Sequence, residues 1–445
     1  MMRDWLSAQA LARPDGAALI IGAATLTYRA LHERTAAFAA RLAAAGVERG
    51  TVVGVLLSNR LEAALAVHAA PRLGVTLALF NTRLTPVELD GQVRAAECRV
   101  LVCERDTLPT ALAIPSAPRV LCVDPVNDQR LTPINRLSGD SAAYRESDID
   151  LGAPFAIIFT SGTTGMPRGA VLTYGAFFAS AMASAYRIGV LPHDRWLCAL
   201  PIYHVGGLSI LLRSCLYGTA VDLWQRFDAP AIMERLRSAP VTLLSLVPTM
   251  LYRLLEQPGA APPPYLQLVL LGGAAAPPDL LERALRAGWP IATTYGLTEA
   301  ASQVATALPE EVRRKPGSVG RPLIFSRVRV VDEQGRDQPP GVYGDILVQS
   351  SNPHARLPRR CAARRRRLVS HGGHWLPRRR RRPVGGAAAQ RPDHQRRREY
   401  LPGGSRAGAA PASGSRRCCR GGRAIGGVGT AGWRGYRPAR PNRER

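Results

Sequence analysis

The stretch Phe159 to Ala170 reads F-T-S-G-T-T-G-M-P-R-G-A and follows an apolar run, Phe155 to Phe159, that has the composition of a buried strand. Its three glycines allow the backbone to approach an anion closely, and its four hydroxyl side chains add hydrogen-bond donors. It is not a Walker A loop, G-x-x-x-x-G-K-[ST], because Pro167, Arg168 and Gly169 follow the turn. The composition fits a phosphate-binding loop, and it also fits an ordinary Ser/Thr/Gly-rich surface loop.

Before this stretch, strand patterns and helix patterns alternate along the chain. Apolar residues at helical spacing run from Leu26 to Gly46, and a glycine is typical of a helix end. Val52 to Leu57 then has the pattern of a strand, Glu62 to Leu73 that of a helix, and Leu77 to Phe80 that of another strand. Such alternation predicts a parallel sheet with helices on its faces.

The same alternation continues after the stretch. Tyr174 to Tyr186 has the composition of an Ala-rich helix, and Asp228 is in position to cap another helix with Pro230 in its first turn. Further strands are predicted at Trp196 to Leu200, Val241 to Val247, Leu266 to Leu271 and Ile291 to Thr294. Because ligands of open α/β sheets bind at the carboxyl ends of the strands, the loops that follow these strands should converge on one crevice. Pro115 to Glu146 lacks a clear pattern and is expected to be a loop.

The order T-S-G-T-T-G-x-P-[KR]-G resembles the signature of the adenylate-forming superfamily, which contains acyl-CoA synthetases, luciferases and peptide-synthetase adenylation domains. Three later loops carry further pieces of that pattern: P-I-Y-H-V-G-G at Pro201 to Gly207, L-G-G-A-A-A at Leu271 to Ala276, and Y-G-L-T-E at Tyr295 to Glu299. Taken singly, each motif has an ordinary explanation. His204 in the first motif is then a hydrogen-bonded histidine of the core or rim, the second motif is a strand-to-helix turn, and Glu299 in the third is a surface or helix-capping acid. Together, and in this order, they resemble the superfamily over about residues 10 to 350.

Within the superfamily, three stretches resemble the o-succinylbenzoate-CoA ligases of menaquinone synthesis. They are N-T-R-L-T at Asn81 to Thr85, P-I-Y-H-V-G-G-L-S-I-L-L-R-S at Pro201 to Ser214, and Y-G-L-T-E-A-A-S-Q-V-A-T at Tyr295 to Thr306. Since acyl pockets change through few residues, another acyl- or aryl-CoA ligase remains an alternative.

The resemblance implies a fold, a reaction and a set of substrates. The expected fold is α/β, with a large N-terminal domain over residues 1–350 made of parallel sheets flanked by helices, plus a small β subdomain. The expected enzyme is an ATP-dependent acid–thiol ligase that uses ATP, Mg²⁺ and coenzyme A. A carboxylate attacks the α-phosphorus of ATP to give an acyl-adenylate and pyrophosphate, and the thiol of coenzyme A then displaces AMP. Such chemistry needs positioning and charge neutralisation more than a nucleophilic side chain.

The resemblance also implies roles for particular residues. The triphosphate is expected to bind Thr160, Ser161, Gly162, Thr163, Thr164, Gly165 and Arg168, where Arg168 replaces the family's usual lysine. The adenine slot is expected to comprise Gly273, Ala274, Ala275, Tyr295 and Gly296. Glu299 is the expected magnesium ligand and Thr298 is expected near the α-phosphate. The acyl pocket is expected to contain His204, Gly207 and Ser302, and the catalytic residues to be Glu299, Thr298 and His204.

The net charge of +26 is concentrated in the last part of the chain. Residues 351–445 contain 26 arginines and only three acidic residues, Asp393, Glu399 and Glu444, so they carry +23 of the total. The first 350 residues are therefore nearly neutral, as in an ordinary globular protein. One interpretation of the tail is a basic, disordered arm in a non-enzymatic protein that binds nucleic acid.

A frame change near Ser350 to Arg356 is the other interpretation of the tail. Codons for Asp393 to Arg406 can be written so that a one-base shift reads I-I-S-G-G-E-N-I-Y-P-A-E-V, and the same shift turns Arg367 to Pro377 into G-W-F-H-T-G-D-I-G-Y-L. Both resemble expected segments of the family. The tail would then have no selected fold, and its low aliphatic content and high charge predict disorder. The ribose-binding aspartate and the mobile lysine of the family's small C-terminal domain would be missing, so this chain is expected to be impaired.

The remaining composition excludes several classes of protein. The cysteines form no C-x-x-C pair and no paired spacing with histidines, which argues against a zinc site or a disulfide framework. The start, Met1 to Trp5, lacks a signal peptide's apolar region, and the longest apolar stretch, Leu61 to Phe80, contains charged residues. A cytoplasmic location is therefore expected, with a carboxylic acid, ATP and coenzyme A as partners and with no specific nucleic acid.

Overall fold

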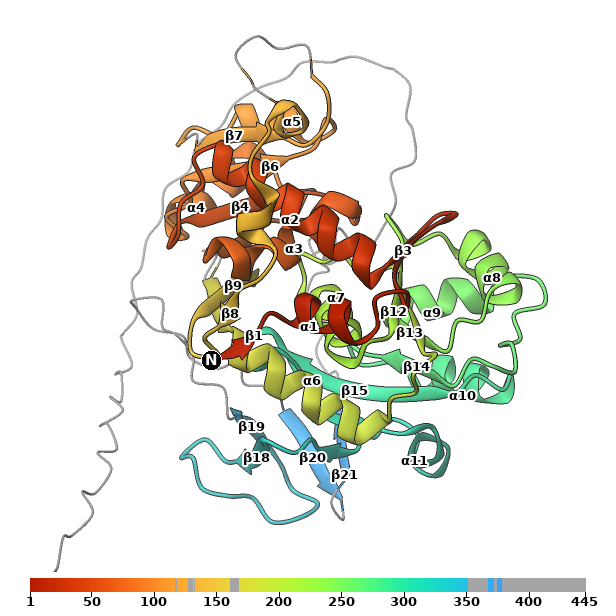
Figure 1. Ribbon diagram of the computed structural model, residues 1–445. Coiled ribbons are helices and arrows are strands. Elements are labelled where there is room, and N and C mark those ends of the chain that lie inside the picture. Colours follow the sequence, from red (N-terminus) through yellow and green to blue (C-terminus); the bar gives the residue numbers. More distant parts are fainter. Residues whose placement is uncertain are drawn as a thin grey trace, which may run out of the picture. The chain divides into compact units, whose positions relative to one another are not determined.

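The computed structural model describes residues 1–116, 118–126, 131, 133–160, 168–350, 367–371 and 374–377, and for Arg168 and the last two ranges it describes the backbone alone. All of these residues belong to one unit, Met1–Gly385. Helices and strands alternate along most of this unit, and Figure 1 shows the sheets with helices packed against them.

A six-stranded sheet has the strand order β10-β9-β5-β4-β6-β7. Its strands are β4 (Val52–Leu56), β5 (Thr76–Leu79), β6 (Val100–Cys103), β7 (Arg119–Cys122), β9 (Pro154–Thr160) and β10 (Arg168–Thr173). All neighbouring pairs are parallel except β9 and β10, which form an antiparallel hairpin.

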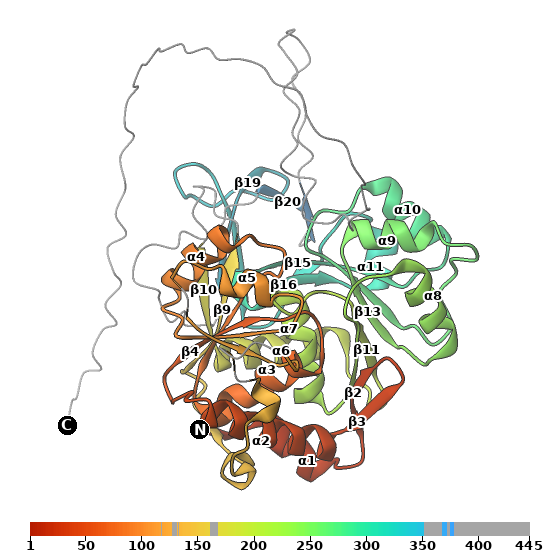
Figure 2. The same cartoon turned by 90° about the horizontal axis from the view of Figure 1, so that it is seen from above.

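Helices cover both faces of this sheet because apolar side chains alternate along its strands. On β4, Val53 and Val55 belong to the apolar cluster formed with α2 (Tyr28–Ala44) and α3 (Leu61–Leu73). Leu56 belongs instead to the cluster formed with α4 (Pro86–Ala95) and α5 (Leu108–Leu112). In Figure 2 these helices flank the strands of the sheet.

The second sheet has nine strands in the order β17-β16-β15-β14-β13-β11-β12-β2-β3. They are β2 (Ala17–Ile21), β3 (Ala24–Thr27), β11 (Arg195–Cys198), β12 (Ala220–Leu223), β13 (Leu243–Leu246), β14 (Leu268–Leu271), β15 (Ile291–Leu297), β16 (Ser302–Ala307) and β17 (Arg321–Pro322). The six central strands are parallel, while β3, β16 and β17 join antiparallel.

Two layers of helices enclose the second sheet. One contains α1 (Trp5–Ala12), α6 (Tyr174–Ile188) and α7 (Val205–Tyr217), and the other contains α8 (Ala229–Ser238), α9 (Pro248–Leu255), α10 (Pro278–Arg286) and α11 (Pro309–Arg314). On β14, Leu268 and Leu270 pack with α6 and α7, whereas Val269 and Leu271 pack with α8 to α10. The first of these clusters also contains α2 and α3, so it connects the two sheets in one core.

The small β subdomain is an antiparallel sheet in the order β18-β19-β20-β21. Its strands are β18 (Ser326–Val331), β19 (Tyr343–Ser350), β20 (Arg367–His371) and β21 (His374–Pro377), so two of them lie within the arginine-rich tail. The other elements are the strand pair β1 (Met2–Arg3) and β8 (Asp148–Ile149) and the 3-10 turns η1 (Ile134–Arg136), η2 (Ser141–Tyr144) and η3 (Thr298–Ala300).

The α/β class, the parallel sheets and the predicted cap are confirmed. Asp228 accepts a hydrogen bond from the Ala231 amide at 3.0 Å, which begins α8 as expected. The prediction of a loop from Pro115 to Glu146 was wrong in part, because β7 and the turns η1 and η2 lie there. Pairing with β6 forms β7 despite its weak local pattern. In the described part of the chain, no helix is both long and apolar enough to cross a bilayer.

Candidate active site

The predicted phosphate loop connects the two strands of the β9–β10 hairpin. Thr160 at the end of β9 pairs with Arg168 at the start of β10. The predicted phosphate-binding residues between them, Ser161, Gly162, Thr163, Thr164 and Gly165, lie outside the described residues. The hairpin nevertheless fixes both ends of the loop at the carboxyl end of β9, which is where a parallel sheet presents its ligands.

The turn between β15 and β16 carries the residues predicted for magnesium and the α-phosphate. Thr298 and Glu299 lie in η3, and both side chains are partly exposed. Ala301 has a φ of 53° and Ser302 a φ of 107°, so the chain turns through the left-handed region before entering β16. A Cβ atom on Gly296 would overlap the carbonyl oxygen of Ser302, which explains why glycine is needed there.

Glu299 fits the requirements of a magnesium ligand. Its carboxylate has no ion pair or hydrogen bond with any residue that the structure describes, so both oxygens can coordinate a cation. The described residues contain no group of three or more His, Cys, Asp or Glu side chains that could hold a metal by themselves. Magnesium bound to nucleotides commonly takes one or two carboxylates together with phosphate oxygens and water, and one free carboxylate meets that need.

The predicted adenine slot begins at the turn between β14 and α10. Gly273 has a φ of 79°, and Ala274 and Ala275 are exposed. A Cβ atom on Gly272 would lie 2.6 Å from Thr294 Cγ2 on β15, so this turn lies directly against the neighbouring strand. Tyr295, the next residue of β15, is buried. The structure therefore places the L-G-G-A-A-A and Y-G-L-T-E motifs at the carboxyl ends of two adjacent strands, β14 and β15.

The predicted acyl residues lie where β11 leads into α7. His204 is the residue before α7, and Gly207 lies in its first turn. A Cβ atom on Gly207 would overlap the carbonyl oxygen of Pro201, so a larger residue would push the loop and the helix apart. Asn59, which follows β4 of the other sheet, accepts from the Ile202 amide at 2.9 Å and donates to the Leu200 carbonyl at 2.9 Å. The acyl loop is thus tied to both sheets.

Desolvation of the ring and the nearby Arg83 guanidinium lower the pKa of His204 to about 4, although the residue is exposed, and this favours the neutral imidazole near neutral pH. Arg83 belongs to the N-T-R-L-T motif, which therefore lies near enough to the acyl loop for its charge to act on His204. A neutral imidazole can donate or accept a hydrogen bond without adding a charge to the pocket.

Arg213 is a functional candidate that sequence reasoning did not single out. It lies on α7, nine residues after His204, and is 2% exposed. Its Nη2 donates to Ser180 Oγ at 3.1 Å, but its Nε has no partner, and no carboxylate of the described residues pairs with it. Burial lowers its pKa. A buried guanidinium without a carboxylate is unfavourable unless a ligand supplies the negative charge. The available signal was an arginine within the apolar run L-S-I-L-L-R-S.

A short chain of hydrogen bonds brings these parts together. Ser180 on α6 accepts from Arg213 and donates to the Ala301 carbonyl at 2.7 Å, so α7 is linked to the turn that holds Glu299 and Ser302. On the other side of that turn, η3 lies against β10, the strand that follows the phosphate loop. The strand that follows the phosphate loop, the turn that holds the predicted magnesium ligand and the buried Arg213 of α7 are therefore connected.

Comparison with known proteins identifies the family of the chain. The family model of the AMP-binding enzymes matches residues 6–354. A 2-succinylbenzoate–CoA ligase of Bacillus licheniformis is 36% identical over 346 residues, which cover 78% of this chain and 70% of the relative. The corresponding ligase of Bacillus cereus is 37% identical over 352 residues, covering 79% and 70%.

Solved structures give the same result. The o-succinylbenzoate CoA synthetase of Bacillus subtilis in complex with the acyl-adenylate OSB-AMP matches with a TM-score of 0.78 and 30% identity, covering 85% of this chain and 78% of that one. Its complex with ATP and magnesium matches with a TM-score of 0.77 and 30% identity, covering 84% and 79%. The chain therefore belongs to the AMP-binding enzyme family, and the superfamily resemblance of its motifs is confirmed.

Proposed function

We propose that the site is built to convert 2-succinylbenzoate, ATP and coenzyme A into 2-succinylbenzoyl-CoA, AMP and pyrophosphate. The observation that carries this proposal is the link Arg213–Ser180–Ala301, which sets a buried cation beside the turn that contains Glu299 and Ser302. The relatives named for this reaction support the same assignment.

The buried guanidinium favours a substrate with two carboxylates. One carboxylate must remain free to attack the α-phosphorus, so it cannot also be held tightly in an ion pair. A second carboxylate on the same molecule would neutralise Arg213, which has no acidic partner among the described residues. The lowered pKa of His204 favours its neutral form, and Gly207 brings α7 close to the loop, so the acyl loop itself adds no charge around an aromatic ring.

The nucleotide would occupy the region between the phosphate loop and the β15–β16 turn. Glu299 would hold magnesium, which neutralises charge on the phosphates when bound. Gly273 and Tyr295 would border the adenine, and Thr298 would donate to the α-phosphate. With both reactants held, the carboxylate oxygen forms a bond to phosphorus, pyrophosphate leaves, and the thiol later displaces AMP at the acyl carbon.

We further propose that this chain turns over slowly. Its single lysine, Lys315, directly follows α11 and does not lie in any loop assigned to the site. The family match ends at residue 354, and the segments expected after it can be found only in a shifted reading frame. Sequencing the gene across Ser350 to Arg356 tests the frame change, because an in-frame sequence with no base added or missing would contradict it.

Substrate choice can be tested by binding, which does not require turnover. We expect calorimetry on the full chain with Mg-ATP to show 2-succinylbenzoate binding at least about tenfold tighter than benzoate, since only the former offers a second carboxylate to Arg213. Pyrophosphate release with 2-succinylbenzoate should be slow in this chain and faster in a frame-corrected one. Equal affinity for benzoate, or tighter binding of a fatty acid, would favour another acyl- or aryl-CoA ligase.

A further inference from the structure

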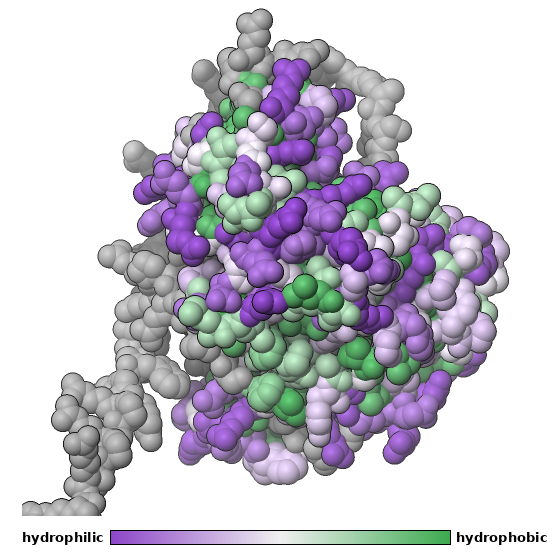
Figure 3. All heavy atoms as spheres, viewed as in Figure 1, coloured by the Kyte–Doolittle hydropathy of each residue, from purple (hydrophilic) through white to green (hydrophobic). Residues whose placement is uncertain are grey.

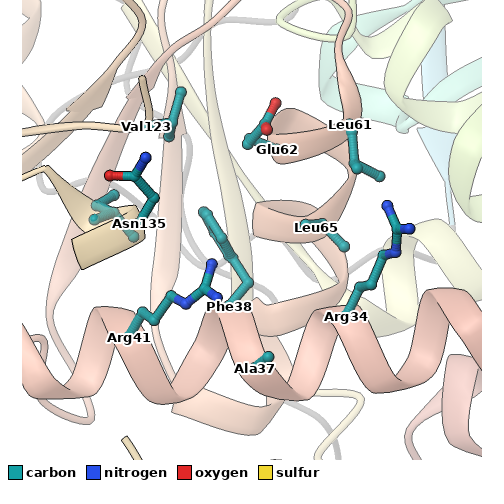
Figure 4. Close-up of a pocket in the computed structure, with 10 residues that line it drawn as sticks. Arg34, Ala37, Phe38, Arg41, Leu61, Glu62, Leu65, Val123 and Asn135 are labelled. Atoms are coloured by element: carbon teal, nitrogen blue, oxygen red, sulfur yellow. The ribbon is translucent and has the colours of Figure 1, made fainter. Parts of the chain in front are cut away.

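A cavity of about 280 Å³ lies between α2 and α3, away from every residue assigned to the ligase site. Its floor is apolar and buried, formed by Phe38, Leu65, Val123 and Ile134. Two arginines of α2, Arg34 and Arg41, extend along its rim with Phe38 between them (Figure 4). The cavity thus combines an apolar interior with two positive charges.

Neither guanidinium is neutralised within the described part of the chain. Arg34 is exposed and Arg41 half-buried, and the structure gives neither an ion pair nor a side-chain hydrogen bond. The acid in the opposite wall, Glu62, is already engaged, because its Oε2 lies 2.6 Å from Arg60 Nε. By contrast, Arg29 of the same helix pairs with Asp15 at 3.1 Å.

The spacing of the two arginines defines the shape of a ligand. Seven residues along a helix correspond to about 10 Å, and both side chains lie on the same face as Ala37 and Phe38. In Figure 4, Arg41 lies at the same end of the cavity as Asn135, and Arg34 at the end near Leu61. A molecule that fits both ends carries an acidic group at each terminus and an apolar middle that covers Phe38.

We propose that this cavity is a binding site for a small dicarboxylate with an apolar middle, separate from the ligase site. Each carboxylate accepts hydrogen bonds from one guanidinium, and Asn135 can donate its amide at the Arg41 end. Covering the apolar floor removes apolar surface from water, which favours binding. The site should therefore bind a dianion with an apolar middle more tightly than a purely polar dianion. The proposal does not depend on the identity of the acid that the ligase site activates.

The probe is nonanedioate, whose carboxylates are about 10 Å apart when the chain is extended, matching the helical spacing. Calorimetry on the full chain should show saturable binding that weakens at least about tenfold in R34Q/R41Q, the loss expected from removing charge-assisted hydrogen bonds. R29Q, the matched control on the same helix, should bind as the parent does. If the double variant does not fold, R41Q alone should show the loss.

Hydrogen exchange locates the ligand independently of affinity. Nonanedioate should protect peptides from residues 28–44 and 61–73, and R213M should leave both the protection and the affinity unchanged. Protection confined to residues 205–217, or its loss in R213M, would put the probe in the acyl pocket and overturn the proposal. Unchanged affinity in R34Q/R41Q, or equally tight binding of nonanoate, would overturn it as well.

Discussion

Replacing Arg213 by Met should raise the stability of the fold and weaken the binding of a dicarboxylate substrate roughly a hundredfold. The methionine keeps much of the length of the side chain but removes a charge that is 2% exposed and has no carboxylate partner among the described residues. Exchanging buried charges for apolar side chains of similar size is often neutral or stabilising by about 1–4 kcal/mol. We expect a gain of about 1 kcal/mol, because the hydrogen bond to Ser180 is lost as well.

The opposite effect is expected on the ligand. Without the guanidinium, the second carboxylate of 2-succinylbenzoate would be buried without a counter-ion, which typically costs about 2–5 kcal/mol of binding free energy. A loss of about 3 kcal/mol corresponds to roughly a hundredfold weaker binding. Benzoate, which lacks that carboxylate, should bind R213M and the parent equally well. Urea unfolding and calorimetry on the same preparations measure both quantities.

Arg72 provides the matched control. Its side chain is 0% exposed and its Nε lies 2.9 Å from Asp4 Oδ2, so R72M leaves a buried carboxylate without its partner. That change should destabilise the fold by about 3–5 kcal/mol. If R213M destabilised the protein as R72M does, and 2-succinylbenzoate bound R213M with unchanged affinity, Arg213 would be a structural residue and the argument from its missing partner would be refuted.

Three further predictions concern single positions. G296A should destabilise the fold by about 2 kcal/mol or more and weaken ATP binding, because the new Cβ atom would overlap the Ser302 carbonyl. As a control in the same urea titration, G91A should stabilise the fold by about 0.5–1 kcal/mol, because Gly91 lies inside α4 with open space around it. E299Q should leave the melting temperature unchanged but abolish the magnesium dependence of ATP binding. If calorimetry showed the same magnesium dependence in E299Q as in the parent, Glu299 would not be the metal ligand. Burial lowers the pKa of His68 to about 4. Between about pH 6.5 and pH 4 the unfolded state therefore binds a proton at His68 that the folded state does not. The free energy of unfolding should be highest above about pH 6.5 and fall by about 3 kcal/mol as the pH drops toward 4, and H68L should lack this fall.

Periodic elements were predictable from the sequence because their burial pattern is local. A strand was expected from Val52 to Leu57 and a helix from Glu62 to Leu73, and the structure has them at Val52–Leu56 and Leu61–Leu73. The helix ends at Gly74 in the left-handed conformation that glycine favours. The strand β10 was missed because its six residues follow the glycine-rich loop directly and are ordered by pairing with β9. The helix α7 was missed because Gly206 and Gly207 in its first turn resemble a loop.

The site was predictable as a set of motifs but not as a geometry. The order of the motifs predicts that Glu299, Ser302 and His204 share one site. The contact that links Arg213 on α7 to the turn with Glu299 and Ser302 runs through Ser180 and Ala301, which are 121 residues apart in the chain. Ser180 belongs to no quoted motif, Ala301 was given no role within its motif, and serine and alanine carry no chemical signal by themselves. Long-range contacts of this kind follow from tertiary packing, which local patterns do not encode.

Photolabelling with 8-azido-ATP tests the central claim most directly, because it locates the adenine without requiring turnover. The claim is that the turns after β14 and β15 form the nucleotide site of this chain. Mass spectrometry should find the label on peptides that contain residues 271–276 or 291–299, and excess AMP should prevent the labelling. Label found mainly elsewhere in the chain, or labelling that AMP does not reduce, would contradict the claim.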